Sequence, residues 1–282
     1  MIFRQYIKKK RHKYGVKFFE LCTYGGLVLN VEVYSGTKFQ DAEGLGQTGA
    51  VVLHLMQSYF DKGYHLFIDN WYNSVSLTEY FSQRKTYITG TLRRDRKRNP
   101  QEVINKKLLK GEMFFQSLGD VSVTKWKDKR DVQVISNALV PAMVKTTNRH
   151  GKEKDKPNVV KIYNENMSGI DRSDQMLSYH SGLRKTIRWY KKVGIHLMEV
   201  MLSNAYYMYA SVTPCRNVKN IKDFREVVVE SLIVPPRKKR LMRPQLNFHC
   251  LSAIPATEKK KTPTRRCQHC RKRTEKSLGT NV

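Results

Sequence analysis

Apolar residues in the first part of the chain form short runs that alternate or recur at helical spacing. Residues 16–22 and 27–34 are apolar runs on either side of Tyr24-Gly25-Gly26, a pattern typical of a β-hairpin. A run with helical spacing follows over 51–59, and we expect Thr48 to cap this helix.

Three further elements follow in the order strand, helix, strand. Residues 64–68 are apolar and lead directly to Asp69, Ser74 precedes a run with helical spacing, and residues 86–91 have the pattern of another strand. This order predicts an α/β fold in which the last two strands are parallel.

The pattern changes between residues 96 and 160. Short mixed runs such as Val121-Ser122-Val123-Thr124 indicate strands, separated by polar stretches. We interpret this section as a β-rich insertion rather than a continuation of the sheet. The predicted core then has two parts, residues 1–95 and 161–234, and a tail over 235–282.

Helical spacing returns in the second part of the core, as one stripe along a long helix. The stripe consists of Val193, Leu197, Met201, Ala205 and Met208. Such a stripe more often faces the core than anything else, so we predict that orientation.

The most unusual property of the composition is its excess of positive charge. The chain has 282 residues, with 53 Lys and Arg against 24 Asp and Glu and a formal net charge of +29. The tail over 235–282 alone contains 14 of the basic residues and two of the acidic ones. Such an excess favours a polyanionic partner, nucleic acid ahead of an acidic membrane surface.

The sequence does not indicate a membrane protein or a disulfide framework. No apolar stretch approaches the roughly 18–20 residues of a spanning helix, and the basic N-terminus lacks the apolar core of a signal peptide. Of five cysteines, only Cys267 and Cys270 have metal-ligand spacing. We expect an intracellular protein, in which the basic run 237–240 serves nuclear import or phosphate contact, or is a solvated linker.

Three aspartates are candidates for chemistry. Asp69 follows an apolar strand, at the place where the crevice of an open α/β sheet forms, although many aspartates there only cap a helix or make a turn. Asp171 and Asp174 are three residues apart, so their carboxylates share one face of a helix or its first turn. Such a pair repels unless a cation such as Mg²⁺ neutralises it; the alternative is that both complement the helix dipole.

A basic segment with aromatic residues follows the paired carboxylates. Its candidate DNA-binding residues are Arg184, Lys185, Arg188, Trp189, Lys191 and Lys192. Cations interleaved with aromatic rings suit phosphate neutralisation and stacking on bases. The segment therefore brings a candidate polyanion site next to a candidate metal site.

Taken together, these motifs resemble those of piggyBac-type DNA transposases. The resemblance rests on Asp69-Asn70-Trp71-Tyr72-Asn73-Ser74, on residues 167–176, and on Arg184-Lys185-Thr186 with Arg188-Trp189, in that order. It implies an RNase H-like catalytic core that carries out cut-and-paste transposition by two-metal phosphoryl transfer with Mg²⁺.

The resemblance also assigns roles. Asp69 matches the second catalytic aspartate of the family and Asp171 the third, and Asp174 matches a nearby aspartate of the same motif. The implied partner is the DNA of transposon ends and the implied compartment is the nucleus, while the resemblance leaves a homodimer open.

The chain departs from the family pattern near both ends. The family's first catalytic aspartate lies on a strand before the motif that begins at Phe3, and we do not expect Glu20 or Glu32 to replace it. An RNase H-like core without this first, central strand would have a gap between residues 16–22 and 64–68, with damaged or rearranged packing. Cys267 and Cys270 resemble the start of a zinc-binding module, but structural Zn²⁺ needs four ligands and we do not expect a stable site.

Three functions remain open at this level. The first is an active transposase, and the second is a DNA-binding derivative that does not cleave DNA. The third is a fragment without a function of its own. We expect a transposase-derived, DNA-binding protein that is inactive in catalysis as the sequence stands.

Overall fold

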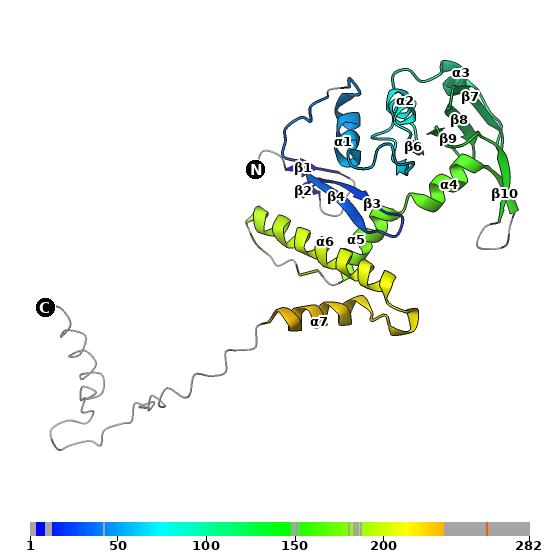
Figure 1. Ribbon diagram of the computed structural model, residues 1–282. Helices are drawn as coiled ribbons and strands as arrows, with labels where there is room; N and C mark the ends of the chain where they lie inside the picture. Colours follow the sequence, from blue (N-terminus) through cyan, green and yellow to red (C-terminus); the bar gives the residue numbers. More distant parts are fainter. Residues whose placement is uncertain are drawn as a thin grey trace. The chain divides into compact units, whose positions relative to one another are not determined.

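The computed structural model (Figure 1) describes residues 4–8, 13–41, 43–147, 151, 153–179, 181–182, 186, 188–233 and 258. The chain divides into two compact units, residues 1–228 and 229–282, and the fold described below is that of the first. The elements are β1 (Gln5–Tyr6), β2 (Tyr14–Gly15), β3 (Phe18–Cys22), β4 (Val28–Val33), α1 (Gly46–Met56), β5 (His65–Ile68), α2 (Val75–Gln83), β6 (Tyr87–Thr91), α3 (Gln101–Asn105), β7 (Met113–Leu118), β8 (Val121–Lys127), β9 (Asp131–Ser136), β10 (Met143–Thr147), β11 (Glu153–Pro157), α4 (Asn158–Asn166), α5 (Gly169–Tyr179), α6 (Trp189–Val212), a 3₁₀ turn (Cys215–Asn217) and α7 (Ile221–Leu232).

A five-stranded mixed sheet forms the centre of the fold, in the order β5-β6-β9-β8-β7. β5 and β6 are parallel, which confirms the prediction from the strand-helix-strand order, and the other pairs are antiparallel. The mixed α/β architecture expected from the sequence is therefore present.

The section between residues 96 and 160 continues this sheet, so our interpretation of it as separate from the sheet was wrong. β9 pairs directly with β6, with Thr89 opposite Ser136. The physical reason is apolar packing: Val121, Val123 and Ile135 share one buried cluster with Val75 of α2. The strands of this section therefore complete the core that β6 begins.

The predicted hairpin is present as β3 and β4, which pair antiparallel in a sheet of their own. β3 and β5 consequently lie in different sheets and are not paired with each other. Two smaller antiparallel pairs, β1 with β2 and β10 with β11, complete the described strands.

Local capping explains where the first two helices begin. The Ser74 hydroxyl accepts a hydrogen bond from the Leu77 amide at 3.2 Å, as predicted for the start of α2. The prediction for α1 was wrong, because Thr48 lies inside the helix. The Asp41 carboxylate takes the capping role from farther away, accepting from the amides of Leu45 at 2.8 Å and Gly46 at 2.7 Å.

Helix α1 covers one face of both β3 and β5. Val52 and Met56 form a buried cluster against which Leu21 of β3 and both Leu66 and Ile68 of β5 pack. Both strands therefore pack on the same helix although no hydrogen bonds join them. The space left between the two strands is the cavity described below.

Helix α6 presents the later part of its predicted core stripe, Met201, Ala205 and Met208, to solvent, which corrects our expectation there, while Val193 and Leu197 are half-buried. Met201 is 61% exposed and Met208 63% exposed, whereas Val200 and Ser203 are buried. Asn204 fixes this rotation, since its side chain accepts from the Val28 amide at 2.9 Å and donates to the Val28 carbonyl at 2.7 Å. None of the helices in the described ranges is long and apolar enough to cross a bilayer.

Candidate functional site

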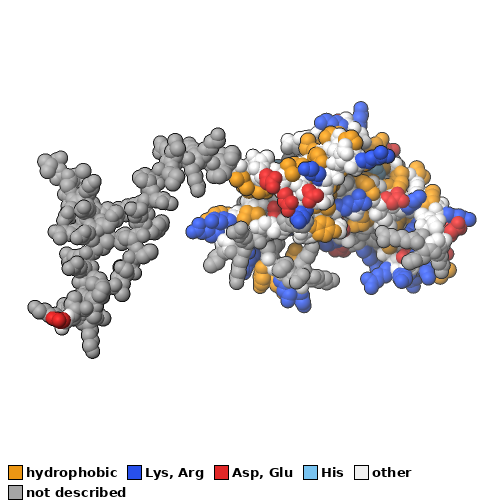
Figure 2. Space-filling model, turned by 90° about the horizontal axis from the view of Figure 1, so that it is seen from below, with side chains coloured by type: hydrophobic (Ala, Val, Ile, Leu, Met, Phe, Trp, Pro, Cys, Tyr) orange, Lys and Arg blue, Asp and Glu red, His pale blue; other side chains and the backbone are white. Residues whose placement is uncertain are grey.

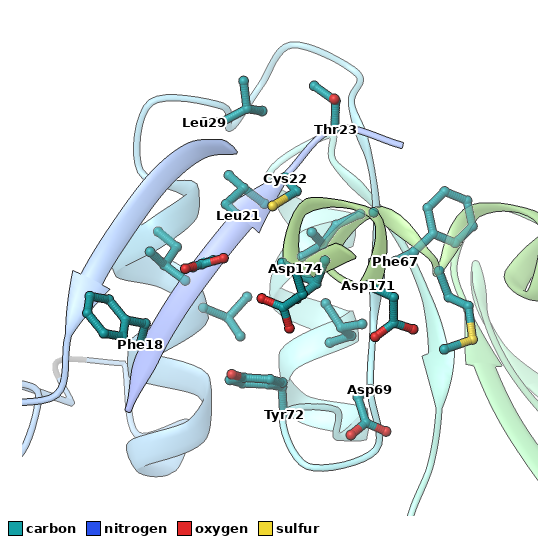
Figure 3. Close-up of a pocket in the computed structure, with 18 of the residues that line it drawn as sticks. Phe18, Leu21, Cys22, Thr23, Leu29, Phe67, Asp69, Tyr72, Asp171 and Asp174 are labelled. Atoms are coloured by element: carbon teal, nitrogen blue, oxygen red, sulfur yellow. The ribbon is translucent and has the colours of Figure 1, made fainter. Parts of the chain in front are cut away.

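A cavity of about 1400 Å³ opens between β3 and β5. Helix α1 forms its floor, and residues of α5 and of the start of α6 line its other side. Figure 3 shows Phe18, Leu21 and Cys22 on one side of this space and Phe67 and Asp69 on the other. The cavity is larger than the roughly 300–1,000 Å³ typical of small-molecule pockets.

Asp69 stands at the cavity edge because β5 ends there in a tight turn. The Asn70 amide donates to Asp69 Oδ1 at 2.5 Å, and the Tyr72 amide donates to the Asp69 carbonyl at 3.1 Å. The guanidinium of Arg96 donates to the Trp71 carbonyl, which ties the turn to the loop after β6. The position of the Asp69 carboxylate is therefore fixed by hydrogen bonds within the turn and to Arg96.

Close packing beneath this turn depends on Gly90 of β6. A Cβ atom at Gly90 would collide with the Ile68 carbonyl oxygen and would lie 2.6 Å from Nδ2 of Asn73, which is fully buried. Only glycine allows β5, the Asp69 turn and β6 to approach this closely.

Helix α5 brings Asp171 and Asp174 to the same cavity. Its first residue, Gly169, packs so closely on the turn after β3 that a Cβ there would lie 2.5 Å from the Thr23 carbonyl oxygen. Figure 3 shows the carboxylates of Asp171 and Asp174 in the part of the cavity that Asp69 borders. The structure therefore brings Asp69 to the same cavity as two aspartates that lie about a hundred residues later in the sequence.

The three aspartates offer carboxylate oxygens, the ligands that hard divalent cations prefer. Among the described residues, no three His, Cys, Asp or Glu side chains are grouped closely enough to hold a metal ion. Mg²⁺ is commonly held by one or two protein carboxylates together with phosphate oxygens of a substrate. Asp69 and Asp171 are carboxylates of the kind that such a shared site uses, and both line the cavity.

Burial and negative charge raise the pKa of two neighbouring groups. The pKa of the Tyr72 phenol is raised to about 12 by burial, with smaller contributions from Asp69 and Glu20. Burial likewise raises the pKa of the Cys22 thiol to about 12, again with contributions from Glu20 and Asp174. Both groups are therefore protonated at neutral pH.

The structure adds Glu20 and His196, which our sequence analysis did not select. Both line the cavity, with His196 Nε2 3.8 Å from Glu20 Oε1. The Glu20 side chain is only 9% exposed, and its carboxylate beside His196 raises the pKa of the imidazole. The sequence signal for this pair was Glu20 itself, a charged residue between the apolar Phe19 and Leu21 of a predicted strand. The pattern of that strand does not identify His196, on a distant helix, as its partner.

Part of the predicted DNA-binding segment reaches the cavity. Arg188 lies directly before the first residue of α6. Two residues of the helix, Trp189 and Lys192, line the cavity, and the side chain of Trp189 is 40% exposed. Lys191 lies beside them on an exposed part of the helix. Arg184 and Lys185, like the candidate zinc ligands Cys267 and Cys270, lie outside the described residues.

The surface of the described core carries many cations. Figure 2 shows lysine and arginine side chains spread over much of the visible face, with fewer acidic groups between them. This distribution agrees with the net charge of +29 and suits contact with a polyanion.

Comparisons with known proteins agree on one family. The family model Transposase IS4 matches residues 1–206. The human PiggyBac transposable element-derived protein 2 is 26% identical over 223 residues, covering 73% of this chain and 37% of that protein. The human PiggyBac transposable element-derived protein 3 is 25% identical over 296 aligned residues, covering 96% of this chain and 49% of that protein.

A solved structure shares the fold. It is a piggyBac transposase seen by cryo-EM in a synaptic complex with hairpin DNA, with a TM-score of 0.70 and 23% sequence identity over 92% of this chain and 56% of that one. The chain spans half or less of the length of the curated relatives it matches. On the extent of the family match and the agreement of these relatives, the chain belongs to the Transposase IS4 family, as a piggyBac-type transposase sequence.

Proposed function

We propose that this chain is a transposase-derived DNA-binding protein built on an RNase H-like core, with Asp69 and Asp171 as its metal-binding carboxylates. One observation carries the proposal. One aspartate comes from the turn after β5 and the other from α5; both line a single cavity, and Trp189 and Lys192 of the basic segment line the same cavity. A polyanion entering there would meet cations, an exposed aromatic ring and hard oxygen ligands together.

The residues divide between binding and metal coordination. Lys191 and Lys192 would neutralise DNA phosphates, and Trp189 would stack on a base or sugar. Asp69 and Asp171 would hold divalent ions together with phosphate oxygens of the DNA, and Asp174 adds negative charge nearby. Mg²⁺ bound in this way supplies charge neutralisation at the phosphate and lowers the pKa of water.

DNA binding and DNA cleavage place different demands on the chain. Binding needs cations, which are abundant, whereas two-metal cleavage needs a fuller set of carboxylates than the described residues group together. We therefore propose that DNA binding is retained and that cleavage is weak or absent in the chain as it stands. A nuclear location and the ends of a transposon as the preferred DNA belong to the same proposal.

The test has two arms that use the full chain. Fluorescence anisotropy with a labelled terminal-repeat duplex and a random duplex, titrated with salt, measures binding and specificity. Nicking of a supercoiled plasmid with Mg²⁺ or Mn²⁺ measures cleavage, with Asp69→Asn and Asp171→Asn as test variants and Asp155→Asn, an exposed aspartate of β11, as the control.

We expect salt-dependent binding that is tighter for the terminal repeat, and no nicking above that of D69N. Nicking by the unaltered chain and D155N that both test variants lose would show an active enzyme and contradict the second half of the proposal. Equal affinity for both duplexes at every salt concentration would contradict specific DNA recognition.

A further inference from the structure

The segment that joins α6 to α7 contains a threonine followed by a proline (Figure 1). Thr213 caps the C-terminus of α6, Pro214 follows it, and Arg216 lies three residues after the threonine. Of the nine prolines in the chain, only Pro214 and Pro263 follow a serine or threonine. The second case, Thr262-Pro263-Thr264-Arg265, has the same spacing of the arginine but lies outside the described residues.

The backbone at Thr213 and Pro214 is extended. Thr213 has φ −91° and ψ 133°, and Pro214 has φ −54° and ψ 135°. The proline ring fixes its own φ and disfavours a helical conformation in the residue before it, so the motif itself ends α6 at this point. Protein kinases bind the residues around a phosphate acceptor in an extended conformation, and these two residues already have it.

The Thr213 hydroxyl is available for reaction. The Thr213 amide donates to the Tyr209 carbonyl at 3.0 Å, but no described residue forms a hydrogen bond with the hydroxyl. Thr213 itself is half-buried, and the residues on both sides of it are exposed: Ser211, Val212, Pro214, Cys215, Arg216 and Asn217.

Only a short turn follows the extended pair. In the 3₁₀ turn Cys215–Asn217, the Asn217 amide donates to the Pro214 carbonyl at 2.8 Å, and the Tyr209 hydroxyl donates to the Asn217 carbonyl at 3.2 Å. A single exposed turn with few hydrogen bonds opens more easily than a packed helix. Arg216 can therefore extend along a kinase together with Thr213 and Pro214.

We propose that Thr213 is a phosphorylation site for a proline-directed protein kinase that also selects a basic residue three positions after the threonine. Proline suits a kinase pocket that requires no backbone N–H, and the Arg216 guanidinium pairs with acidic groups of the kinase. The phosphate donor is ATP. A bond forms between Oγ1 of Thr213 and the γ-phosphorus, the bond from that phosphorus to the β–γ bridging oxygen breaks, ADP leaves, and a kinase aspartate accepts the hydroxyl proton.

The site is separate from the cavity and from DNA binding. Thr213 follows a helix of 24 residues whose first residue, Trp189, lines the cavity. At the rise of an α-helix the two ends are about 35 Å apart, which is several times the Debye length of about 8 Å at physiological salt. The kinase assay contains no DNA, so its result does not depend on the proposed function.

The test uses the full chain with Thr262→Ala, which removes the second threonine–proline pair. The chain is incubated with ATP, Mg²⁺ and a purified cyclin-dependent kinase, and tandem mass spectrometry locates and quantifies the phosphate over time. Pro214→Ala and Arg216→Gln test the two recognition residues. Lys222→Gln, at a 62% exposed lysine of α7, is the matched control for loss of one positive charge outside the motif.

We expect phosphate at Thr213, at least tenfold slower transfer in P214A, at least threefold slower transfer in R216Q and an unchanged rate in K222Q. Absence of phosphate at Thr213 would overturn the proposal, as would equal rates in P214A and the parent. If P214A does not fold, the comparison of R216Q with K222Q decides, and equal rates in those two variants would overturn it.

A synthetic peptide of residues 208–219 separates the motif from its presentation by the fold. We expect the full chain to be phosphorylated at Thr213 at a rate within about tenfold of that of the peptide. Phosphorylation of the peptide with none at Thr213 of the full chain would show that the folded protein hides the threonine, and would overturn the proposal.

Discussion

Nε2 of His196 lies 3.8 Å from Oε1 of Glu20, which links the long helix α6 to strand β3 across one side of the cavity. Glu20 is almost enclosed, and the Phe18 ring packs against the imidazole at 4.8 Å. The pair therefore joins two elements that are about 175 residues apart in the sequence.

This pair should make stability depend on pH. The neighbouring Glu20 carboxylate, together with the charges of Glu199 and Asp174, raises the pKa of His196 above its usual value of 6.5. The stabilisation is therefore complete below about pH 6.5 and is lost as the pH rises through the raised pKa. His196→Phe should lower the free energy of unfolding by about 1–2 kcal/mol at pH 6 and by less at pH 9, measured by urea denaturation.

The control is another histidine–glutamate pair. His54 lies 3.1 Å from Glu32, but the two side chains are 48% and 36% exposed. Exposed pairs contribute little, so His54→Phe should change stability by less than about 0.5 kcal/mol at both pH values. A loss in H196F that is the same at pH 6 and pH 9 would show that the imidazole charge is not involved.

Gly90 should be essential to the support of Asp69. An alanine there would place Cβ against the Ile68 carbonyl and Asn73, so Gly90→Ala should lower the free energy of unfolding by about 1–3 kcal/mol. Gly194→Ala in α6 is the control, since nothing lies within 4 Å of its added Cβ and alanine favours a helix. Urea denaturation measures both variants, and a G90A protein as stable as the parent would refute the close packing.

Cys22 should react slowly with alkylating reagents. A pKa of about 12, against 9.0 for an unperturbed thiol, leaves roughly a thousandfold less thiolate at pH 8. Labelling with iodoacetamide, followed by peptide mass spectrometry, should find Cys22 at least about a hundredfold slower than the exposed Cys215. The rate at Cys22 should keep rising tenfold per pH unit beyond pH 10, and a plateau near pH 9 would contradict the raised pKa.

The basic segment should contribute to DNA affinity in two separable ways. Lys192→Gln should reduce the slope of log affinity against log salt by about 1, because one phosphate contact is lost. Trp189→Ala should weaken binding by about 1–3 kcal/mol and leave the slope unchanged.

The matched control for these two variants is Lys222→Gln. Lys222 is 62% exposed on α7 and lies 3.8 Å from Glu226, so its removal should change affinity little. Salt titrations by fluorescence anisotropy compare the three variants. Equal changes in K222Q and K192Q would show that only net charge matters.

The sequence by itself determined the elements whose cause is local. The alternation of residues 27–34, the Ser74 cap and the apolar run that ends at Asp69 each act over a few residues, so their patterns could be read directly. The strand-end position of Asp69 and the spacing of Asp171 and Asp174 made all three candidates, the resemblance assigned their roles, and the structure places all three at one cavity.

Only the tertiary structure decided the relationships between distant residues. Asp41 replaces Thr48 in capping α1, β9 joins β6, and Asn204 turns the methionine stripe of α6 to solvent by binding β4. The Glu20–His196 pair belongs to the same class. Each of these features depends on hydrogen bonds or packing between segments that are distant in the sequence. The spacing of residues within one segment cannot predict them, because it does not identify the segment that will lie beside it.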